Sequence, residues 1–200
     1  NFMNESNFFM FENQAYNSEV QYKWMVEKSL AGTFMATSPT NPFDCGADSR
    51  GCTPGQHTYA DTFIDAGVKN GVNPISLVSR VKIEQGNKGS ALSLGGGWNK
   101  QYIGYYNFFN INANGATTDD VILNGLRHAY NKNWNNPYIS ILEGASLVGN
   151  SYVGLGQSTV YYQKFNTINQ IYSYQYMQNI AAPYTEGYNS YVSYFRSFDT

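Results

Sequence analysis

Apolar residues recur along much of this chain at the three- and four-residue spacing of amphipathic helices. In the helix expected over residues 18–31, Val20, Trp24 and Val26 can share one buried face. Ile141, Ala145 and Val148 share a face in a later segment. The pattern predicts helices over residues 18–31, 58–70, 74–85, 118–132 and 137–153.

Helix starts and stops support these boundaries. Ser18 is a possible N-cap, and Asn73 precedes Pro74 at a first helical position. Thr117 and Asp120 form a capping box in which Asp replaces the usual Glu. Asn136-Pro137 opens the next helix in the same way as Asn73-Pro74.

Residues 87–111 break the helical pattern. Three consecutive glycines, at 95–97, precede clustered and alternating aromatic residues, which predicts a small hairpin or irregular β lobe. The Tyr-rich tail from Tyr161 onward is expected to be helical in two pieces around Pro183. The predicted class is therefore mainly α (α+β).

The first 57 residues differ from the rest. Residues 1–18 are rich in Asn and Phe without clean periodicity, and we expect an arm that packs on the domain. A long loop then carries Cys45 and Cys52. A short disulfide is the simplest interpretation and implies an oxidising, extracellular setting, but free thiols remain an alternative. A metal site that includes His57 is a third, although the spacing matches no common zinc pattern.

Composition narrows the function classes. The chain has 200 residues and a net charge of -2, so nothing suggests a nucleic-acid partner. Charged residues make up 13% and Tyr numbers 18, which suits an uncharged glycan unless the composition only reflects an AT-rich genome. No apolar run approaches the length of a membrane span, and no signal peptide is visible. Because the chain begins at Asn1, we expect a mature or excised piece.

Glu84 is the candidate for chemistry. It falls in the last turn of the helix over 74–85, three residues after Val81 and seven after Leu77, and so is expected to be partly buried. Burial and the negative end of the helix dipole both favour the protonated carboxyl, which a general acid needs. Pairing with Arg80, or a solvated helix end, is the alternative.

Four segments in order resemble glycoside hydrolase family 73, the endo-β-N-acetylglucosaminidase domains of bacterial (clostridial-type) cell-wall autolysins. They are GVNPISLVSRVKIEQGNKGS, GYYNFFNINANG, ILEGASLVGNSYVGLGQSTVYYQKFN and YQYMQNIAAPYTEGYNSY. The resemblance covers about residues 58–195. It implies a lysozyme-like helical domain over 58–200, with a small β lobe and a cleft between the helices and that lobe. Residues 1–57 match the family less clearly, and we expect them to pack on this domain. The resemblance also implies cleavage of the β-1,4 bond after N-acetylglucosamine in peptidoglycan.

The same resemblance assigns roles to residues. Glu84 becomes the general acid, and Tyr176 falls where the family carries an active-site Tyr. Asn107, Phe108 and Ile111 match an asparagine-aromatic signature that lines the cleft, and Phe109 is expected either to stack on a sugar or to fill the lobe. Further substrate-contact candidates are Trp98, Tyr105 and Tyr161, and a structural match is the alternative for Tyr161.

A second carboxylate is not evident. No Asp or Glu occurs between Glu84 and Asp119, and Ile103 stands where similar sequences are expected to carry Glu. One acid would suffice if the substrate's own acetamido oxygen attacked the anomeric carbon, with Tyr176 holding that group. A distant carboxylate that positions water is the other route.

Two other readings of the function stay open. A lytic transglycosylase or muramidase could use the same fold, and an inactive domain could bind glycans through its aromatic lobe. We expect no metal or organic cofactor, a glycan-strand partner without nucleic acid or membrane insertion, a monomer, and secretion to the cell wall.

Overall fold

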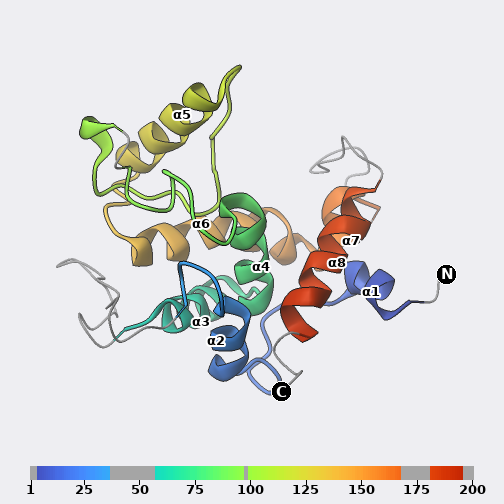
Figure 1. The fold of residues 1–200 in the computed structure, drawn as a ribbon. Coiled ribbons are helices and arrows are strands. Elements are labelled where there is room, and N and C mark those ends of the chain that lie inside the picture. Colours follow the sequence, from blue (N-terminus) through green and yellow to red (C-terminus); the bar gives the residue numbers. More distant parts are fainter. Residues whose placement is uncertain (1–3, 37–56, 97–98, 168–180, 196–200) are drawn as a thin grey trace.

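The computed structural model describes residues 4–36, 57–96, 99–167 and 181–195, and this part of the chain is almost entirely helical (Figure 1). Its elements, in chain order, are α1 (Glu5–Phe8), η1 (Phe9–Phe11), α2 (Lys23–Leu30), α3 (Tyr59–Asn70), α4 (Pro74–Gln85), η2 (Lys100–Tyr102), α5 (Thr118–Asn131), α6 (Pro137–Ser151), η3 (Val153–Leu155), α7 (Val160–Lys164) and α8 (Ala182–Phe195). This confirms the mainly helical class.

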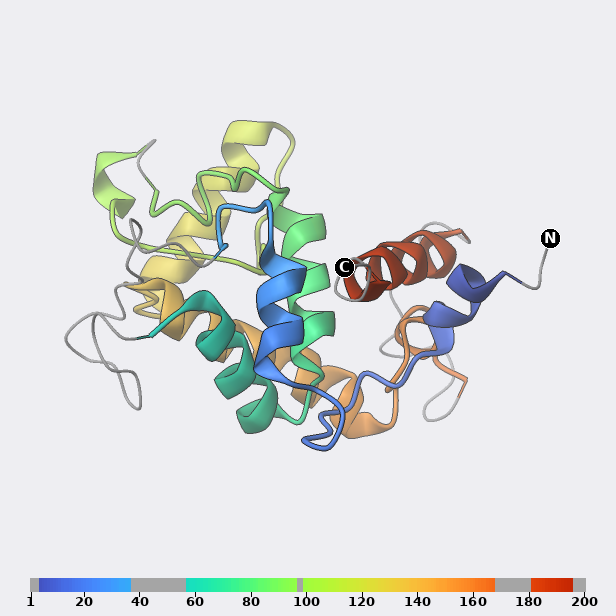
Figure 2. The same ribbon diagram turned by 60° about the horizontal axis from the view of Figure 1, so that its bottom comes forward.

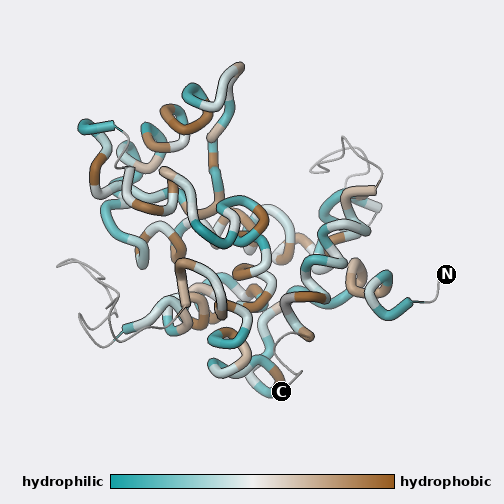
Figure 3. The backbone as a smooth tube through the Cα atoms, in the orientation of Figure 1, coloured by the Kyte–Doolittle hydropathy of each residue, from teal (hydrophilic) through white to brown (hydrophobic). Residues whose placement is uncertain are grey.

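Helix α4 lies at the centre of the molecule. It packs against α2, α3 and α8, while α5 and the loops before it form a lobe on the side away from α8 (Figures 1 and 2). The main core joins apolar residues of α2, α3, α4 and α6, where hydrophobic stretches of the chain meet (Figure 3). Five of the six residues from Ile75 to Arg80 are buried, so α4 presents little free surface before its last turns.

The predicted helix starts are confirmed at four places. Thr58, Asn73, Thr117 and Asn136 each accept a hydrogen bond from a backbone N–H of the first turn, and Thr58 and Thr117 complete capping boxes with Asp residues. Helix α3 ends at Gly71, whose φ of 66° is left-handed and favours glycine. Ile141, Ala145 and Val148 are buried together on α6, as their spacing predicts.

The helix expected from Ser18 begins later, at Lys23. Residues 18–20 form a turn that the buried Gln21 side chain fixes: its Oε1 accepts from the Asn17 N–H at 2.9 Å and its Nε2 donates to the Ala15 carbonyl. As a result Val20 and Trp24 are 57% and 45% exposed, and only Val26 of the predicted face is buried.

The described part of residues 87–111 contains no strand, so the small hairpin or irregular β lobe expected from the sequence is not shown there. The segment is built from turns and η2, and a small core of Leu92, Tyr102 and Leu126 supports it. Backbone hydrogen bonds tie it together, for example from the Asn107 N–H to the Leu92 carbonyl at 2.7 Å. Aromatic clustering here reflects packing under turns rather than strand alternation.

The described part of residues 1–57 contacts the remainder closely. The Gln14 N–H donates to the Ser158 carbonyl, and the Gln14 carbonyl accepts from the Asn73 N–H, both at 2.7 Å. Phe9 lies edge-on to Tyr191 of α8. In the tail, Pro183 occupies the second position of α8. None of the helices in the described residues has the length and apolar character that crossing a bilayer requires.

Candidate active site

Glu84 lies in the last turn of α4, and its side chain is exposed. The expected burial beside Val81 and Leu77 was wrong, because those residues face the core while Glu84 points outward. The Asn110 amide donates to Glu84 Oε2 at 2.9 Å and to the Glu84 backbone carbonyl at 3.1 Å. The carboxylate is therefore open to solvent but has a fixed neighbour.

The neighbouring Gln85 is the buried residue at this helix end. Its Nε2 lies within hydrogen-bonding distance of the carbonyls of Asn107 and Phe108 and of Asn110 Oδ1, and Ser90 Oγ donates to its Oε1. These contacts join the end of α4 to the turn over residues 107–110. Neither Gln85 nor Asn110 was a candidate from the sequence.

Arg80 does not pair with Glu84. Its guanidinium donates to Gln163 Oε1 and lies 6.0 Å from the centre of the Tyr152 ring. The charge of Arg80 is thus directed toward α7 and η3.

Asn107 organises the predicted signature segment from inside. It is fully buried; its amide donates to the carbonyls of Ile111 at 2.8 Å and Gly125 at 3.0 Å, and its Oδ1 accepts from the Ile111 N–H. The turn that results requires a left-handed backbone at Asn110, where φ is 51°. Asn tolerates this conformation better than most residues.

Phe108 and Phe109 point into the core. Phe108 is fully buried and stacks with Phe34 and Tyr106, at ring-centre distances of 6.1 and 6.4 Å. Phe109 is also buried and lies against Gly144 of α6. In this conformation both rings support the turn and neither faces solvent.

The remaining described candidates pack against apolar or aromatic neighbours. Ile111 is half-buried against the main core, Tyr105 lies edge-on to Tyr130, and Tyr161 packs between Phe11 and Phe165. Trp98, Tyr176, Cys45 and Cys52 lie outside the described residues.

A groove runs between α4 and α8, and Glu84 borders it. It consists of two adjoining hollows of about 50 and 390 Å³ that share Ser79 and Ile83. We call it the α4–α8 groove; its further lining residues are Gln14, Ser76, Arg80, Lys82, Asn87, Val160, Lys164, Glu186, Tyr188, Asn189, Ser190 and Val192. The hollow next to Glu84 is therefore lined by α4 and α8, with further residues from α7 and from the N-terminal segment at Gln14.

The groove contains a second carboxylate that the sequence did not suggest. Glu186 of α8 lines the same hollow as Glu84, and its Oε1 lies 2.7 Å from the ammonium of Lys164, whose side chain is largely buried. Because Glu186 is 102 residues after Glu84 in the chain, only the packing of α8 on α4 reveals the proximity.

The chain is similar to known autolysins in sequence, although no family model matches it. The bifunctional autolysin of Staphylococcus epidermidis is 35% identical over 113 residues, which cover 54% of this chain and 8% of that protein. The beta-N-acetylglucosaminidase of Bacillus subtilis is 30% identical over 138 residues, which cover 68% of this chain and 15% of that protein. The chain thus spans only a small part of these relatives.

Solved structures agree on the fold. The crystal structure of Major Bifunctional Autolysin has a TM-score of 0.67 at 20% identity, over 99% of this chain and 72% of that one. A catalytic mutant of S. aureus Autolysin E in complex with the disaccharide NAG-NAM has a TM-score of 0.59 at 24% identity, over 88% and 68%. This chain carries a family 73 glucosaminidase-like domain.

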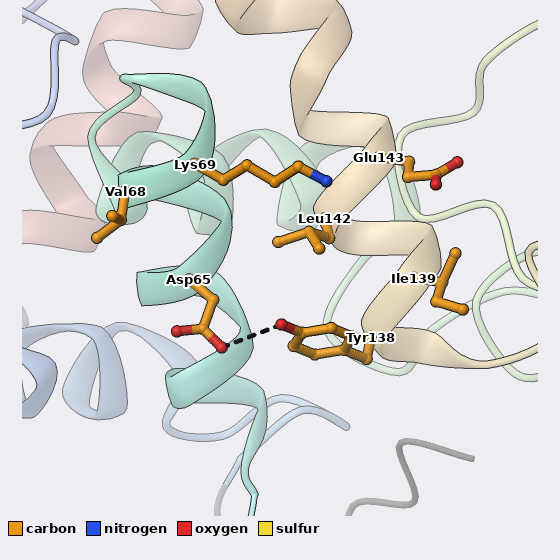
Figure 4. Close-up of a pocket in the computed structure, with 7 residues that line it drawn as sticks. All are labelled: Asp65, Val68, Lys69, Tyr138, Ile139, Leu142 and Glu143. Carbon is orange, nitrogen blue, oxygen red and sulfur yellow. Dashed lines mark hydrogen bonds between the residues drawn. The ribbon is translucent and has the colours of Figure 1, made fainter. Parts of the chain in front are cut away.

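A separate hollow of about 350 Å³ on the glucosaminidase-like domain lies between α3 and α6 (Figure 4). Tyr138 points toward Asp65 there, and its hydroxyl donates to Asp65 Oδ2 at 3.3 Å. Burial raises the pKa of Asp65, and burial together with the Asp65 charge raises the pKa of Tyr138 to about 12. Glu84 does not line this hollow, so it is distinct from the α4–α8 groove.

Proposed function

We propose that this chain is an endo-β-N-acetylglucosaminidase that cleaves the β-1,4 bond after N-acetylglucosamine in peptidoglycan. The observation that carries the proposal is the Glu84 carboxylate, exposed at the end of α4, held by Asn110 and bordering a groove. Similarity to proteins named bifunctional autolysin and beta-N-acetylglucosaminidase supports the reaction class.

Glu84 acts as the general acid and protonates the glycosidic oxygen as the bond breaks. An exposed position is suitable, because the leaving oxygen belongs to a polymer that must approach from solvent. The α4–α8 groove receives part of the glycan strand; the complex of a structural neighbour with NAG-NAM supports a substrate of this kind. Neutral polar side chains such as Asn87, Asn189 and Ser190 suit an uncharged sugar.

The substrate's acetamido oxygen attacks the anomeric carbon, which gives an oxazolinium intermediate and net retention. Tyr176 orients the acetamido group in this route. Glu186 is poorly suited to act as the second catalytic carboxylate, because the Lys164 ammonium 2.7 Å away offsets its negative charge. We assign Glu186 to the wall of the groove.

The residues of the asparagine-aromatic signature support the position of Glu84 indirectly, through the turn that contacts it. Asn107, Phe108 and Phe109 fix the turn that carries Asn110, and Ile111 packs beneath it. Trp98, Tyr105 and Tyr161 remain candidates for contacts along the strand. The catalytic domain comprises residues 58–200 with residues 1–57 packed on it, and the protein acts as a secreted monomer at the cell wall, with Cys45 and Cys52 as a disulfide.

Product analysis tests the reaction. Purified peptidoglycan is digested with the wild type or with Glu84→Gln, the products are reduced with borohydride, and the new ends are identified by mass spectrometry. We expect N-acetylglucosaminitol ends from the wild type alone. Muramitol ends would indicate a muramidase and anhydro-muramic ends a lytic transglycosylase, and either would overturn the proposed bond. Binding of glycan strands without any new ends would indicate a glycan-binding domain.

A further inference from the structure

Asn110 makes the only side-chain hydrogen bond to the Glu84 carboxylate that we find among the described residues. The same amide group also donates to the Glu84 backbone carbonyl at 3.1 Å. One side chain therefore fixes both the end of the α4 backbone and one oxygen of the carboxylate. Since Glu84 is exposed, we take this contact as the main restraint on its rotamers from the part of the chain that the structure describes.

The amide of Asn110 has a defined orientation. Its Oδ1 accepts from Gln85 Nε2 at 2.7 Å, which leaves the Nδ2 group to face Glu84. Gln85 is itself buried and held by Ser90 and by the carbonyls of Asn107 and Phe108. The chain of contacts runs from a buried amide, through Asn110, to the exposed carboxylate.

We propose that Asn110 is a positioning residue that holds the Glu84 carboxylate in a single orientation for proton donation. The inference rests on the proposed function, in which Glu84 is the acid. Asn110 Nδ2 contacts Oε2, so the proton for the leaving oxygen is carried on Oε1, the oxygen that this contact leaves open. A carboxyl that must present one oxygen to the substrate gains from a donor that occupies the other.

Two substitutions separate positioning from folding. Asn110→Gly removes the amide but accepts the φ of 51° without strain. Asn110→Asp keeps the shape, tolerates the same backbone and retains an acceptor for Gln85, but it has no N–H to donate and places a second carboxylate beside Glu84. Both variants also lose the donor to the Glu84 backbone carbonyl, so a purely structural role would make turnover fall only as far as stability falls.

We expect the opposite for turnover of peptidoglycan. Asn110→Gly should lower kcat by about tenfold and keep KM within about twofold of the wild type. Asn110→Asp should lower kcat by about 100-fold. Its urea midpoint of unfolding should nevertheless be no lower than that of the Gly variant. Wild-type kcat for Asn110→Asp, or losses that follow stability in both variants, would overturn the positioning role. Asn114→Gly, which is exposed on the same lobe, serves as the matched surface change.

A spectroscopic readout tests the contact without turnover. In the ¹⁵N spectrum, Glu84→Gln should move the side-chain amide signal of Asn110 and leave that of Asn124, which donates to the Asn114 carbonyl, unchanged. An unmoved Asn110 signal would overturn the inference. An inactive wild type would overturn the proposed function and the positioning role with it, whereas an active wild type with an indifferent Asn110→Asp overturns the positioning role alone.

Discussion

The buried amide of Gln85 donates a hydrogen bond of 2.7 Å to Asn110 Oδ1, and the Asn110 amide in turn donates to Glu84. Two consecutive residues of α4 therefore have opposite environments and a shared partner. Gln85 fixes the helix end to the 107–110 turn from inside, while Glu84 meets the same turn from outside. The proposed acid depends on this turn for its position.

Replacing Gln85 by Leu should destabilise the fold. The substitution removes the Gln85 donor from the buried carbonyls of Asn107 and Phe108, and Asn107 keeps only a long contact of 3.4 Å from the Asn110 N–H. This loss costs about 1–3 kcal/mol. Urea unfolding at equal m-values measures the change. Gln101→Leu, at an exposed position, should stay within about 0.5 kcal/mol of the wild type. Equal stability of the two variants would mean that the Gln85 contacts do not hold the turn.

The absence of a side chain at Gly144 lets the Phe109 ring pack directly against the backbone of α6. A Cβ there would lie 2.5 Å from Phe109 Cδ2, so Gly144→Ala must displace the ring and the turn that it supports. We expect a loss of about 1–3 kcal/mol in the free energy of unfolding, despite the higher helix propensity of Ala. Thermal unfolding compares it with Asn150→Ala, an exposed change on the same helix. A stabilised Gly144→Ala variant would contradict the packing described.

Local signals in the sequence placed the helices well. Thr58, Asn73, Thr117 and Asn136 cap helices because each bonds to residues two or three positions away, and that chemistry is visible in the chain. The start at Ser18 failed because Gln21 fixes a turn through contacts with Ala15 and Asn17, a signal that hydrophobic spacing does not carry.

Local sequence patterns could not predict the contacts that hold the candidate site, because these contacts join residues far apart in the chain. Gln85 and Asn110 are 25 residues apart, and Glu84 and Glu186 are brought to one groove only by the packing of α8 on α4. The burial of Phe108 and Phe109 could not be separated from a sugar-stacking role, since both uses call for the same residue type.

Asp61 should make stability sensitive to acid. Burial alone would raise its pKa, but hydrogen bonds from Lys23 and Thr58 and the Lys23 charge outweigh burial and lower it below 3.8. With its folded pKa below the unfolded value, its ionised form stabilises the protein above about pH 3.8, and the contribution is lost as pH falls through the folded pKa.

The test compares Asp61→Asn with the wild type at two pH values. At pH 7 the variant should be less stable by about 1 kcal/mol, as expected for a weakened helix cap, and the difference should shrink in strong acid. Asp119→Asn, exposed in the first turn of α5, should show a smaller difference at pH 7. A gap that is the same at both pH values would contradict the account of Asp61.

Tyr176→Phe should slow the reaction without affecting the fold. If the hydroxyl orients the substrate acetamido group, its removal should lower kcat by about 10- to 100-fold and change KM little. Steady-state turnover of soluble glycan strands measures this, with Tyr184→Phe, exposed on α8, as the matched change. Normal turnover by Tyr176→Phe would return this tyrosine to a packing role.

The most direct measurement of the central claim compares two leaving groups with Glu84→Gln. Peptidoglycan needs its leaving oxygen protonated, whereas a dinitrophenyl glycoside of an N-acetylglucosamine oligomer releases a stable anion and does not. If Glu84 is the general acid, Glu84→Gln should lose at least about 100-fold in turnover of peptidoglycan and keep most of its turnover of the dinitrophenyl glycoside. An equal loss on both substrates, or full activity on peptidoglycan, would contradict the assignment of Glu84.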